Sequence, residues 1–404
     1  MRLFKHILVA SLVLGASGAA SGDVDRILID RRLEQERIRL LKLDDGSIVY
    51  DDEHGLRRRE PTSLFLALLD PESVAMMPVP DGEFHVLDLI TGERLIGRVA
   101  PEFEHRGARA DELVWEQMSG EEIAVPLDEI DRLTIVPGDT PRRPDEVDDL
   151  IVLRNGDRLG GFVDRIDTSV ALDQSGRLVE VPLERVAVID LANPVEAFDG
   201  TLVWLGDGTI VGVSGFRRAG EGRVEPVPAR GEREPSESND FSMALSEIAA
   251  VAFDRRALVA LGSIAPEFQS PGEGRRWSAP AEVVSESAAL STPDIVLPGP
   301  MTVRWVLPAG VTRFATRAEL PTTMWVWGDC ELVVTMTTRD GDEIELARRR
   351  LCAETPEAWI NVLLDDSQAG NRRLTITVEE GRYGPIQDRV VLRRPMLLQE
   401  GNGQ

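Results

Sequence analysis

The stretch Leu87-Asp-Leu-Ile-Thr-Gly-Glu-Arg-Leu-Ile-Gly-Arg-Val99 contains an apolar strand, a tight turn with Gly92, and a second strand that carries Gly97. The same order of residues recurs in Ile151–Val163 and again in Leu202–Val213. Glycine in the turn supplies the positive φ that hairpins need, and a second glycine suits a strand that bends sharply to close a small barrel. Three copies in one chain indicate tandem repeats of a small β module.

The three copies also end alike, because each has a strand that meets a short turn at Pro126, Pro182 or Met243, followed by a final strand. A fourth, weaker copy is Leu40–Tyr50, and Glu60–Leu69 has the spacing and the Thr/Ser start of a short helix. Four β modules are therefore predicted, at residues 23–80, 81–138, 145–193 and 197–256. Residues 217–240 are rich in Gly, Pro, Glu and Arg, which is typical of a disordered loop.

These modules resemble the Sm-like or SH3-like five-stranded barrels that occur in tandem in exported bacterial proteins. The resemblance covers roughly residues 36–256 and rests on the glycine turns and on the repetition. It implies a spacer or interaction role. Some barrels of this shape bind peptides or RNA, but no aromatic groove recurs in the copies.

The chain changes character after residue 256. A Pro-, Ser- and Gly-rich segment at 257–300 is predicted to be a linker and lead-in, and about seven alternating strands follow within 301–399. Seven or eight short strands separated by turn signals favour an antiparallel β-sandwich. These predicted strands are 303–307, 311–319, 331–338, 343–351, 357–364, 372–379 and 389–393.

The order of these pieces resembles the NPCBM family, the novel putative carbohydrate binding modules found beside glycosidases and in secreted planctomycete proteins. The residues that carry the resemblance are 261–266, 305–314, 318–320, 330–336, 341–343 and 374–378. It implies a galactose-binding-like jelly roll that recognises carbohydrate. One departure is that Ala289–Pro300 lacks the family's histidine-containing stretch.

Two cysteines, Cys330 and Cys352, flank a hairpin pattern whose turn contains Asp340-Gly341. A fold about Gly341 makes the two cysteines direct cross-strand partners, whereas a two-residue Asp-Gly turn leaves them one residue out of register. In an oxidising compartment, a disulfide between neighbouring strands is the favoured interpretation, and two buried free thiols are the alternative. A zinc site is disfavoured, because structural zinc takes four ligands.

Sugar recognition needs an exposed aromatic ring against the pyranose and polar side chains for its hydroxyls. Trp325 and Trp327 alternate around Val326 at an expected strand start, so both would share one face. Arg382, Tyr383 and Asp388 fall in a glycine-bounded loop. These five residues are the predicted ligand-binding set, and the alternatives are buried tryptophans and a structural loop held by an Arg–Asp pair.

Two other tryptophans, Trp305 and Trp359, lie in apolar strands and are predicted to be core residues.

The N-terminus has the layout of a secretory signal at residues 1–20: Arg2 and Lys5, an apolar stretch Ile7–Leu14, and small residues up to Ser21. A membrane anchor is disfavoured, because a membrane-spanning helix needs about 20 apolar residues and this apolar stretch is shorter. No later segment is apolar enough to span a membrane. Export to the periplasm or the exterior is therefore predicted. Removing Arg2 and Lys5 would take the net charge from −25 to −27.

The acidic composition, with 70 Asp and Glu against 45 Lys and Arg, argues against a nucleic-acid partner. No cofactor is predicted, although a structural calcium ion is compatible with such an acidic sandwich. The sequence contains neither a zinc-protease helix nor a nucleophile elbow, so a non-enzymatic protein is predicted. Two hypotheses remain: a protein that binds a polysaccharide or glycan, and a structural or protein-assembly component of the cell envelope with no sugar ligand.

Overall fold

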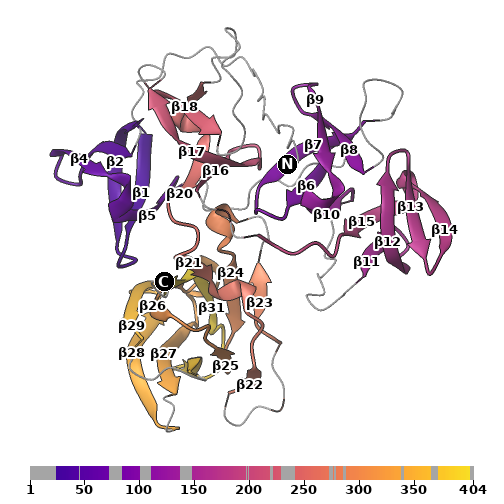
Figure 1. Cartoon of the computed structure of the whole chain (residues 1–404). Coiled ribbons are helices and arrows are strands. Elements are labelled where there is room, and N and C mark those ends of the chain that lie inside the picture. The colour runs from indigo at the N-terminus through magenta and orange to yellow at the C-terminus, as the bar shows by residue number, and fades with distance from the viewer. Residues whose placement is uncertain are drawn as a thin grey trace. The chain divides into compact units, whose positions relative to one another are not determined.

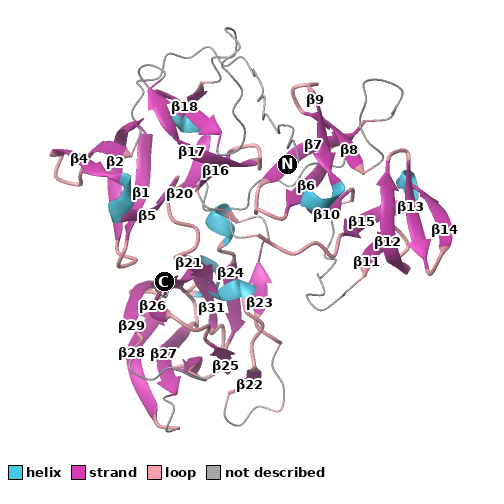
Figure 2. Cartoon of the chain, in the orientation of Figure 1, coloured by secondary structure: helices cyan, strands magenta, loops and turns pink. Residues whose placement is uncertain are grey.

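The structure is a computed structural model, shown in Figure 1. It describes residues 24–44, 46–71, 84–100, 111–136, 148–196, 198, 200–218, 222–228, 242–272, 276, 279–284, 288–337, 341–364 and 372–400. The predicted signal at 1–20 lies outside these residues. Across them the secondary structure is strand, and every helix is a three-residue 3-10 turn (Figure 2). The all-β fold class with antiparallel sheets is therefore confirmed.

Two compact units divide the chain. The first contains Arg39–Thr62 and Met77–Val251, and the second contains Arg26–Ile38, Ser63–Met76 and Ala252–Gln404. The repeated β modules make up most of the first unit, whereas the C-terminal strands belong to the second. The module boundaries predicted from the sequence stay predictions.

Three repeats in the first unit share five antiparallel strands, with one 3-10 turn before the fifth strand. One repeat has β6 His85–Leu89, β7 Arg94–Val99, β8 Glu112–Gln117, β9 Glu122–Pro126, η3 Leu127–Glu129 and β10 Ile130–Thr134. The next has β11 Asp149–Leu153, β12 Arg158–Ile166, β13 Ser169–Gln174, β14 Arg177–Pro182, η4 Leu183–Arg185 and β15 Val186–Asp190. The last has β16 Thr201–Leu205, β17 Ile210–Arg218, β18 Arg223–Pro228, β19 Met243–Ala244, η5 Leu245–Glu247 and β20 Ile248–Ala252.

In each of these repeats the fifth strand pairs with the first, as β10 with β6, β15 with β11 and β20 with β16. The predicted repetition is thus a repetition of strand order and pairing. The assignment to SH3-like or Sm-like barrels stays a prediction.

The weak first copy, by contrast, is divided between the units. Its strands are β1 Val24–Asp30, β2 Gln35–Asp44, β3 Ser47–Asp51, β4 Arg57–Pro61 and β5 Phe65–Leu69, with η1 Thr62–Leu64 before β5. Strands β2, β3 and β4 pair in order in the first unit. Strands β1 and β5 pair with each other in the second unit.

The two glycines that define the repeat have separate roles. Gly92 has a φ of +85° in the hairpin turn, a conformation that other residues rarely adopt. A Cβ atom on Gly97 would lie 2.2 Å from the carbonyl oxygen of Glu116 and 2.7 Å from Nε1 of Trp115. The second glycine is therefore required because the neighbouring strand passes too close for a side chain.

The repeats formed by β6–β10 and β11–β15 share one hydrophobic core. Strands β10 and β15 pair antiparallel through Leu133 and Ile189, and the core continues on both sides of this pair, from Trp115 to Leu172. Strands β10 and β15 are the fifth strands of their repeats. By pairing with each other, they leave neither strand as an open sheet edge on that side.

Two local predictions fail in this part of the chain. The helix predicted over Glu60–Leu69 is reduced to η1, and Phe65–Leu69 is a fully buried strand, because a short apolar run cannot be assigned by periodicity alone. Part of the predicted disordered loop, 217–240, instead pairs as a hairpin, with Arg217 opposite Glu225. Residues 219–221 and 229–240 of that loop lie outside the described residues.

The C-terminal part of the second unit is a sandwich of two antiparallel sheets. The five-stranded sheet has the order β22 Phe268–Pro271, β25 Met301–Val306, β30 Arg373–Glu380, β27 Asp329–Thr337 and β28 Glu343–Cys352. The six-stranded sheet has β23 Glu282–Val284, β24 Asp294–Pro298, β31 Arg389–Gln399, β26 Val311–Glu319 and β29 Glu357–Leu363 in order, with β21 Leu258–Ala260 beside β31. Short 3-10 turns are η6 Leu261–Ser263, η7 Ala289–Ser291 and η8 Thr322–Met324.

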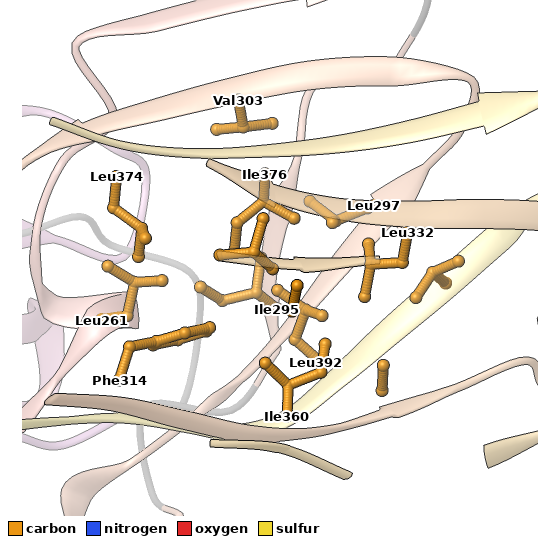
Figure 3. Close-up of a cluster of buried hydrophobic side chains, with 14 of the residues drawn as sticks. Leu261, Ile295, Leu297, Val303, Phe314, Leu332, Ile360, Leu374, Ile376 and Leu392 are labelled. Atoms are coloured by element: carbon orange, nitrogen blue, oxygen red, sulfur yellow. The ribbon is translucent and has the colours of Figure 1, made fainter. Parts of the chain in front are cut away.

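Alternate residues of these strands point into one core between the sheets (Figure 3). Leu332 and Ile376 come from the five-stranded sheet, and Phe314, Ile360 and Leu392 come from the six-stranded sheet. This period of two is the pattern that predicted the sandwich. Trp305 is 2% exposed in the core, as predicted, but Trp359 is only half-buried and is not one of the buried core residues.

The segment 257–300, predicted to be a linker and lead-in, supplies strands to both sheets. Strand β22 pairs with β25, and β24 pairs with β31. Strands of three to five residues containing Pro and Ser have little alternation, so the sequence pattern did not reveal them.

The two cysteines do not form the predicted disulfide, and both are buried free thiols. Strands β27 and β28 pair with Cys330 opposite Leu351 and Asp329 opposite Cys352. The cysteines are therefore one residue out of register, and successive side chains in a strand point to opposite faces. Cys330 faces the core, whereas the Sγ atom of Cys352 lies 3.2 Å from the Oγ1 atom of Thr355.

We expect both thiols to be free in the purified protein and Cys330 to resist alkylation until the protein unfolds. Burial, with the nearby Asp388 and Asp329 carboxylates, raises the pKa of the Cys330 thiol to about 12. Its reactive thiolate is then rarer at pH 8 by a factor on the order of a thousand. Thiol titration without reductant should give two groups per chain in denaturant, and Cys352→Ser should give one. Zero groups in the parent protein would contradict the free-thiol structure.

Candidate functional site

The predicted ligand-binding residues lie in two segments that the five-stranded sheet brings together. Trp325 and Trp327 precede β27, whereas Arg382 and Tyr383 follow β30. Strands β27 and β30 are neighbours, with Cys330 opposite Glu380. The two segments therefore emerge side by side at the same end of this sheet.

Trp327 and Tyr383 make direct contact where these segments meet. Their ring centroids lie 5.8 Å apart with an interplanar angle of 85°, the edge-to-face arrangement that aromatic pairs prefer. The guanidinium carbon of Arg382 lies 5.6 Å from the centroid of the Tyr383 ring. Three of the five predicted residues thus form one cluster.

The surface around this cluster is apolar and exposed. Trp327 is 51% exposed, Tyr383 44% and Trp325 39%, and Val326 and Ile386 are exposed as well. Large exposed apolar groups that gather in one place are a feature of binding surfaces. We call Trp325, Val326, Trp327, Arg382, Tyr383 and Ile386 the aromatic surface.

The prediction that Trp325 and Trp327 alternate along a strand is wrong, although both side chains are exposed. Residues 325–327 form a turn that follows η8, and Trp325 itself has helical dihedral angles. The two side chains therefore do not alternate along a strand. The Trp325 indole Nε1–H donates to the carbonyl oxygen of Leu320 at 2.9 Å, which holds that ring against its own turn.

Asp388 does not belong to the exposed surface. It is 1% exposed, and its Oδ1 atom faces the backbone N–H of Asp329 at 3.4 Å. Its sequence position in a glycine-bounded loop gave no sign of this burial. Asp388 is therefore a support of the two segments rather than a residue that a ligand could reach.

Asp329, which no sequence motif singles out, connects the two segments. Its carboxylate accepts two hydrogen bonds from the Arg350 guanidinium at 2.8 Å each and one from the Arg382 backbone N–H at 3.2 Å. The Arg350 hydrogen bonds, despite partial burial, hold the pKa of Asp329 below its ordinary value. An ionised, buried carboxylate thus fixes the backbone beside Tyr383. In the sequence, Asp329 is marked only by its place directly after Trp327 and Gly328.

Substitution of Gly381 tests how closely the segment after β30 packs against Asp329. A Cβ atom there would lie 1.9 Å from the Asp329 carbonyl oxygen, so Gly381→Ala should force the two segments apart. We expect a loss of about 1–3 kcal/mol in the free energy of unfolding, measured by denaturant titration. Gly160→Ala is the matched control, since its nearest contact would be an ordinary 4.0 Å. Equal effects of both changes would contradict the close packing.

The chemistry of the aromatic surface suits adsorption of a ligand with both apolar and hydroxyl-bearing faces. Exposed indole and phenol rings offer flat apolar area, while Arg382 and the Tyr383 hydroxyl offer polar contacts. Among the described residues, no group of three or more His, Cys, Asp or Glu side chains is placed to hold a metal ion.

Within the described part of the chain, no helix has the length and apolar character to cross a membrane.

No protein-family model matches the sequence, and no curated protein matches it. Among solved structures, the chain is similar to a CBM51 module from Clostridium perfringens GH95 in complex with methyl-galactose, at 14% identity and a TM-score of 0.26, covering 35% of this chain and 99% of that one. It is also similar to the CBM51-2 and INT domains of Clostridium perfringens ZmpB, at 13% identity and a TM-score of 0.26, covering 35% of this chain and 31% of that one. A third similarity is to the CBM22-1 xylan-binding domain of Paenibacillus barcinonensis Xyn10C, at 13% identity and a TM-score of 0.22, covering 33% and 87%.

The chain thus spans less than a third of the ZmpB structure. The assignment of the β-sandwich rests on its own sheets and core.

Proposed function

We propose that this chain is an exported, non-enzymatic protein whose C-terminal sandwich binds carbohydrate through the aromatic surface. The observation that carries the proposal is the exposed Trp327–Tyr383 pair with Arg382 beside it. A soluble domain gains nothing in folding stability from leaving two large rings half-exposed. A pyranose has an apolar face that would cover such a ring and hydroxyl groups that Arg382 and Tyr383 could bind.

Three further observations support the proposal. The sequence resembles carbohydrate-binding modules over the sandwich, and its first twenty residues have the layout of a secretory signal. The cluster also sits on a rigid base, because Asp329 joins the segments on both sides. A preformed surface loses less conformational entropy when a ligand binds.

A second candidate function is protein interaction by the repeats, and one observation favours it. Phe162 and Leu178, on β12 and β14, are both more than half exposed. Each lies opposite Asp173 across β12, β13 and β14, so both side chains share one outer face of these strands. This exposed apolar pair is what a protein contact in the cell envelope would use.

A glycan array probed with the full chain, followed by affinity measurements on the best polysaccharide, tests the proposed function. We expect Trp327→Ala to weaken binding at least tenfold, because the ring would lie in the centre of the contact, and each tenfold loss corresponds to about 1.4 kcal/mol. Its half-exposed position predicts little change in unfolding.

The matched control is Phe268→Ala, an exposed aromatic on β22 of the same sandwich, which should keep full binding. If no glycan is retained, or both variants bind like the parent, the carbohydrate proposal fails. A protein ligand lost on Phe162→Ala would then support the second candidate.

A further inference from the structure

Arg394 is a buried arginine, and two nitrogens of its guanidinium group lack hydrogen-bond acceptors among the described residues. The residue is 6% exposed, and its Nε and Nη1 atoms are buried with no acceptor among the described residues. Buried polar groups in proteins are nearly always hydrogen-bonded, and a buried charge without a partner is unfavourable. A group of this kind has hydrogen-bonding capacity that the described residues do not satisfy.

The strand pairing explains how Arg394 comes to this position. Between β26 and β31, Arg317 lies opposite Arg393 and Ala315 lies opposite Met396, so β31 carries one extra residue. Such a bulge turns a side chain out of the regular alternation. The backbone N–H of Arg394 donates to Oδ1 of Asp294 at 2.9 Å, which fixes the bulge in place.

A second arginine at the same place is also incompletely paired. The buried Nε atom of Arg317 has no acceptor in the part of the chain that the structure describes. The Glu357 carboxylate lies 3.7 Å from Nη1 of Arg317, beyond hydrogen-bond distance. The Arg317 side chain is 36% exposed, and its charge lies near enough to Arg394 to lower the pKa of that residue.

The neighbouring carboxylates are already engaged by Arg393. Its Nε atom donates to Glu319 at 2.6 Å, and its Nη1 atom donates to Asp294 at 2.7 Å. In the described part of the chain, Nε and Nη1 of Arg394 are therefore left without an acceptor, although the Asp294 carboxylate attracts the charge of the guanidinium group. Burial, together with the adjacent Arg317, lowers the pKa of Arg394 to about 10, which still leaves it protonated at neutral pH.

We propose that Arg317 and Arg394 form a binding site for one small oxyanion. A carboxylate, sulfate or phosphate group has several oxygen acceptors in a geometry that a guanidinium group can bind in a bidentate way. In a protein with a net charge of −25, this is a local site of unneutralised positive charge. The site is separate from the aromatic surface and does not depend on the proposed carbohydrate function.

Thermal unfolding of the full chain at pH 7 tests the site. Phosphate, sulfate, acetate and glucuronate are each titrated against chloride at constant ionic strength. We expect at least one of them to raise the unfolding temperature by several degrees and to saturate, because a ligand that binds only the folded state stabilises it by mass action. A response to phosphate or sulfate alone points to a free inorganic ion, and a response to acetate and glucuronate points to a carboxylate, free or on a sugar.

Arg394→Met should abolish the saturable response while keeping the fold, because a methionine can replace a buried unpaired charge without loss of stability. Arg317→Met, at a more exposed position, should weaken the response about tenfold even if Arg394→Met fails to fold. The control is Arg349→Met, since Arg349 is exposed and donates to the Arg348 carbonyl oxygen. No saturable response in the parent, or the same response in Arg317→Met and the parent, would overturn the proposal.

Discussion

Replacing Trp305 by alanine is expected to lower the free energy of unfolding of the sandwich by about 3–5 kcal/mol. Trp305 is 2% exposed and lies on β25 opposite Leu374 of β30, within the core between the two sheets. Removing the indole takes away a large buried area and leaves a cavity that backbone hydrogen bonds on both sides prevent from collapsing. Near-UV circular dichroism in a denaturant titration would measure the change.

Trp359 provides the matched control for this prediction. Both tryptophans lie in apolar strands, but Trp359 is half-buried and outside the core cluster. Trp359→Ala should therefore cost roughly 1–2 kcal/mol, in proportion to the smaller area removed from water. If Trp359→Ala were the more damaging change, the placement of the core between these sheets would be wrong.

Replacing Leu33 by alanine is expected to destabilise the second unit by about 2–5 kcal/mol, although Leu33 is far from the sandwich in sequence. Leu33 sits in the tight turn between β1 and β2 with a φ of +58°, yet it is fully buried. Turn residues are normally solvated, so a buried leucine here needs another element to cover it.

Polar contacts within the second unit show which elements surround this turn. The side-chain amide of Asn361 on β29 donates to the Arg32 carbonyl oxygen at 3.0 Å and to Oε1 of Glu34 at 2.9 Å. The backbone N–H of Phe253 donates to the Leu66 carbonyl oxygen at 2.8 Å. The turn is therefore attached to the sandwich, and Leu33→Ala should lower the sandwich's own unfolding midpoint.

Leu64→Ala is the control for Leu33, because Leu64 is 50% exposed in the same unit and should change stability by less than about 0.5 kcal/mol. An unchanged sandwich transition in Leu33→Ala would show that the turn makes no energetic contribution to it. Because of these contacts, binding experiments on residues 258–404 alone would omit a supporting segment, and the full chain is the suitable material.

Strand assignment from the sequence succeeded where alternation was long. The strand predicted at 311–319 agrees in both bounds with β26, and those predicted at 343–351 and 357–364 agree within one residue with β28 and β29. It failed for β22 to β24 and for β5, which are too short or too uniformly apolar to show a period of two. Alternation of apolar and polar residues identifies a strand only when it continues over several residues.

The candidate site was partly accessible to sequence reasoning. Exposed Trp327, Tyr383 and Arg382 were selected from residue type and glycine-bounded context, and the structure brings them together. Asp388 was selected for the same reasons and is buried, whereas the supporting Asp329 was not selected. The sequence around an Asp residue does not show whether its carboxylate faces a ligand or a neighbouring segment of the chain.

The sequence by itself determined the repeat, the all-β class and the alternating core, because these depend on glycine turns and on the period of side chains along a strand. Only the tertiary structure decided three other features: the one-residue offset between Cys330 and Cys352, the proximity of Trp327 to Tyr383, and the lack of acceptors for Nε and Nη1 of Arg394 among the described residues. The first depends on the register within one hairpin, β27 and β28, and the other two depend on the pairing of strands that are distant in sequence. A single bulge or a shift of one residue changes which side chains face each other, and local pattern does not encode that register.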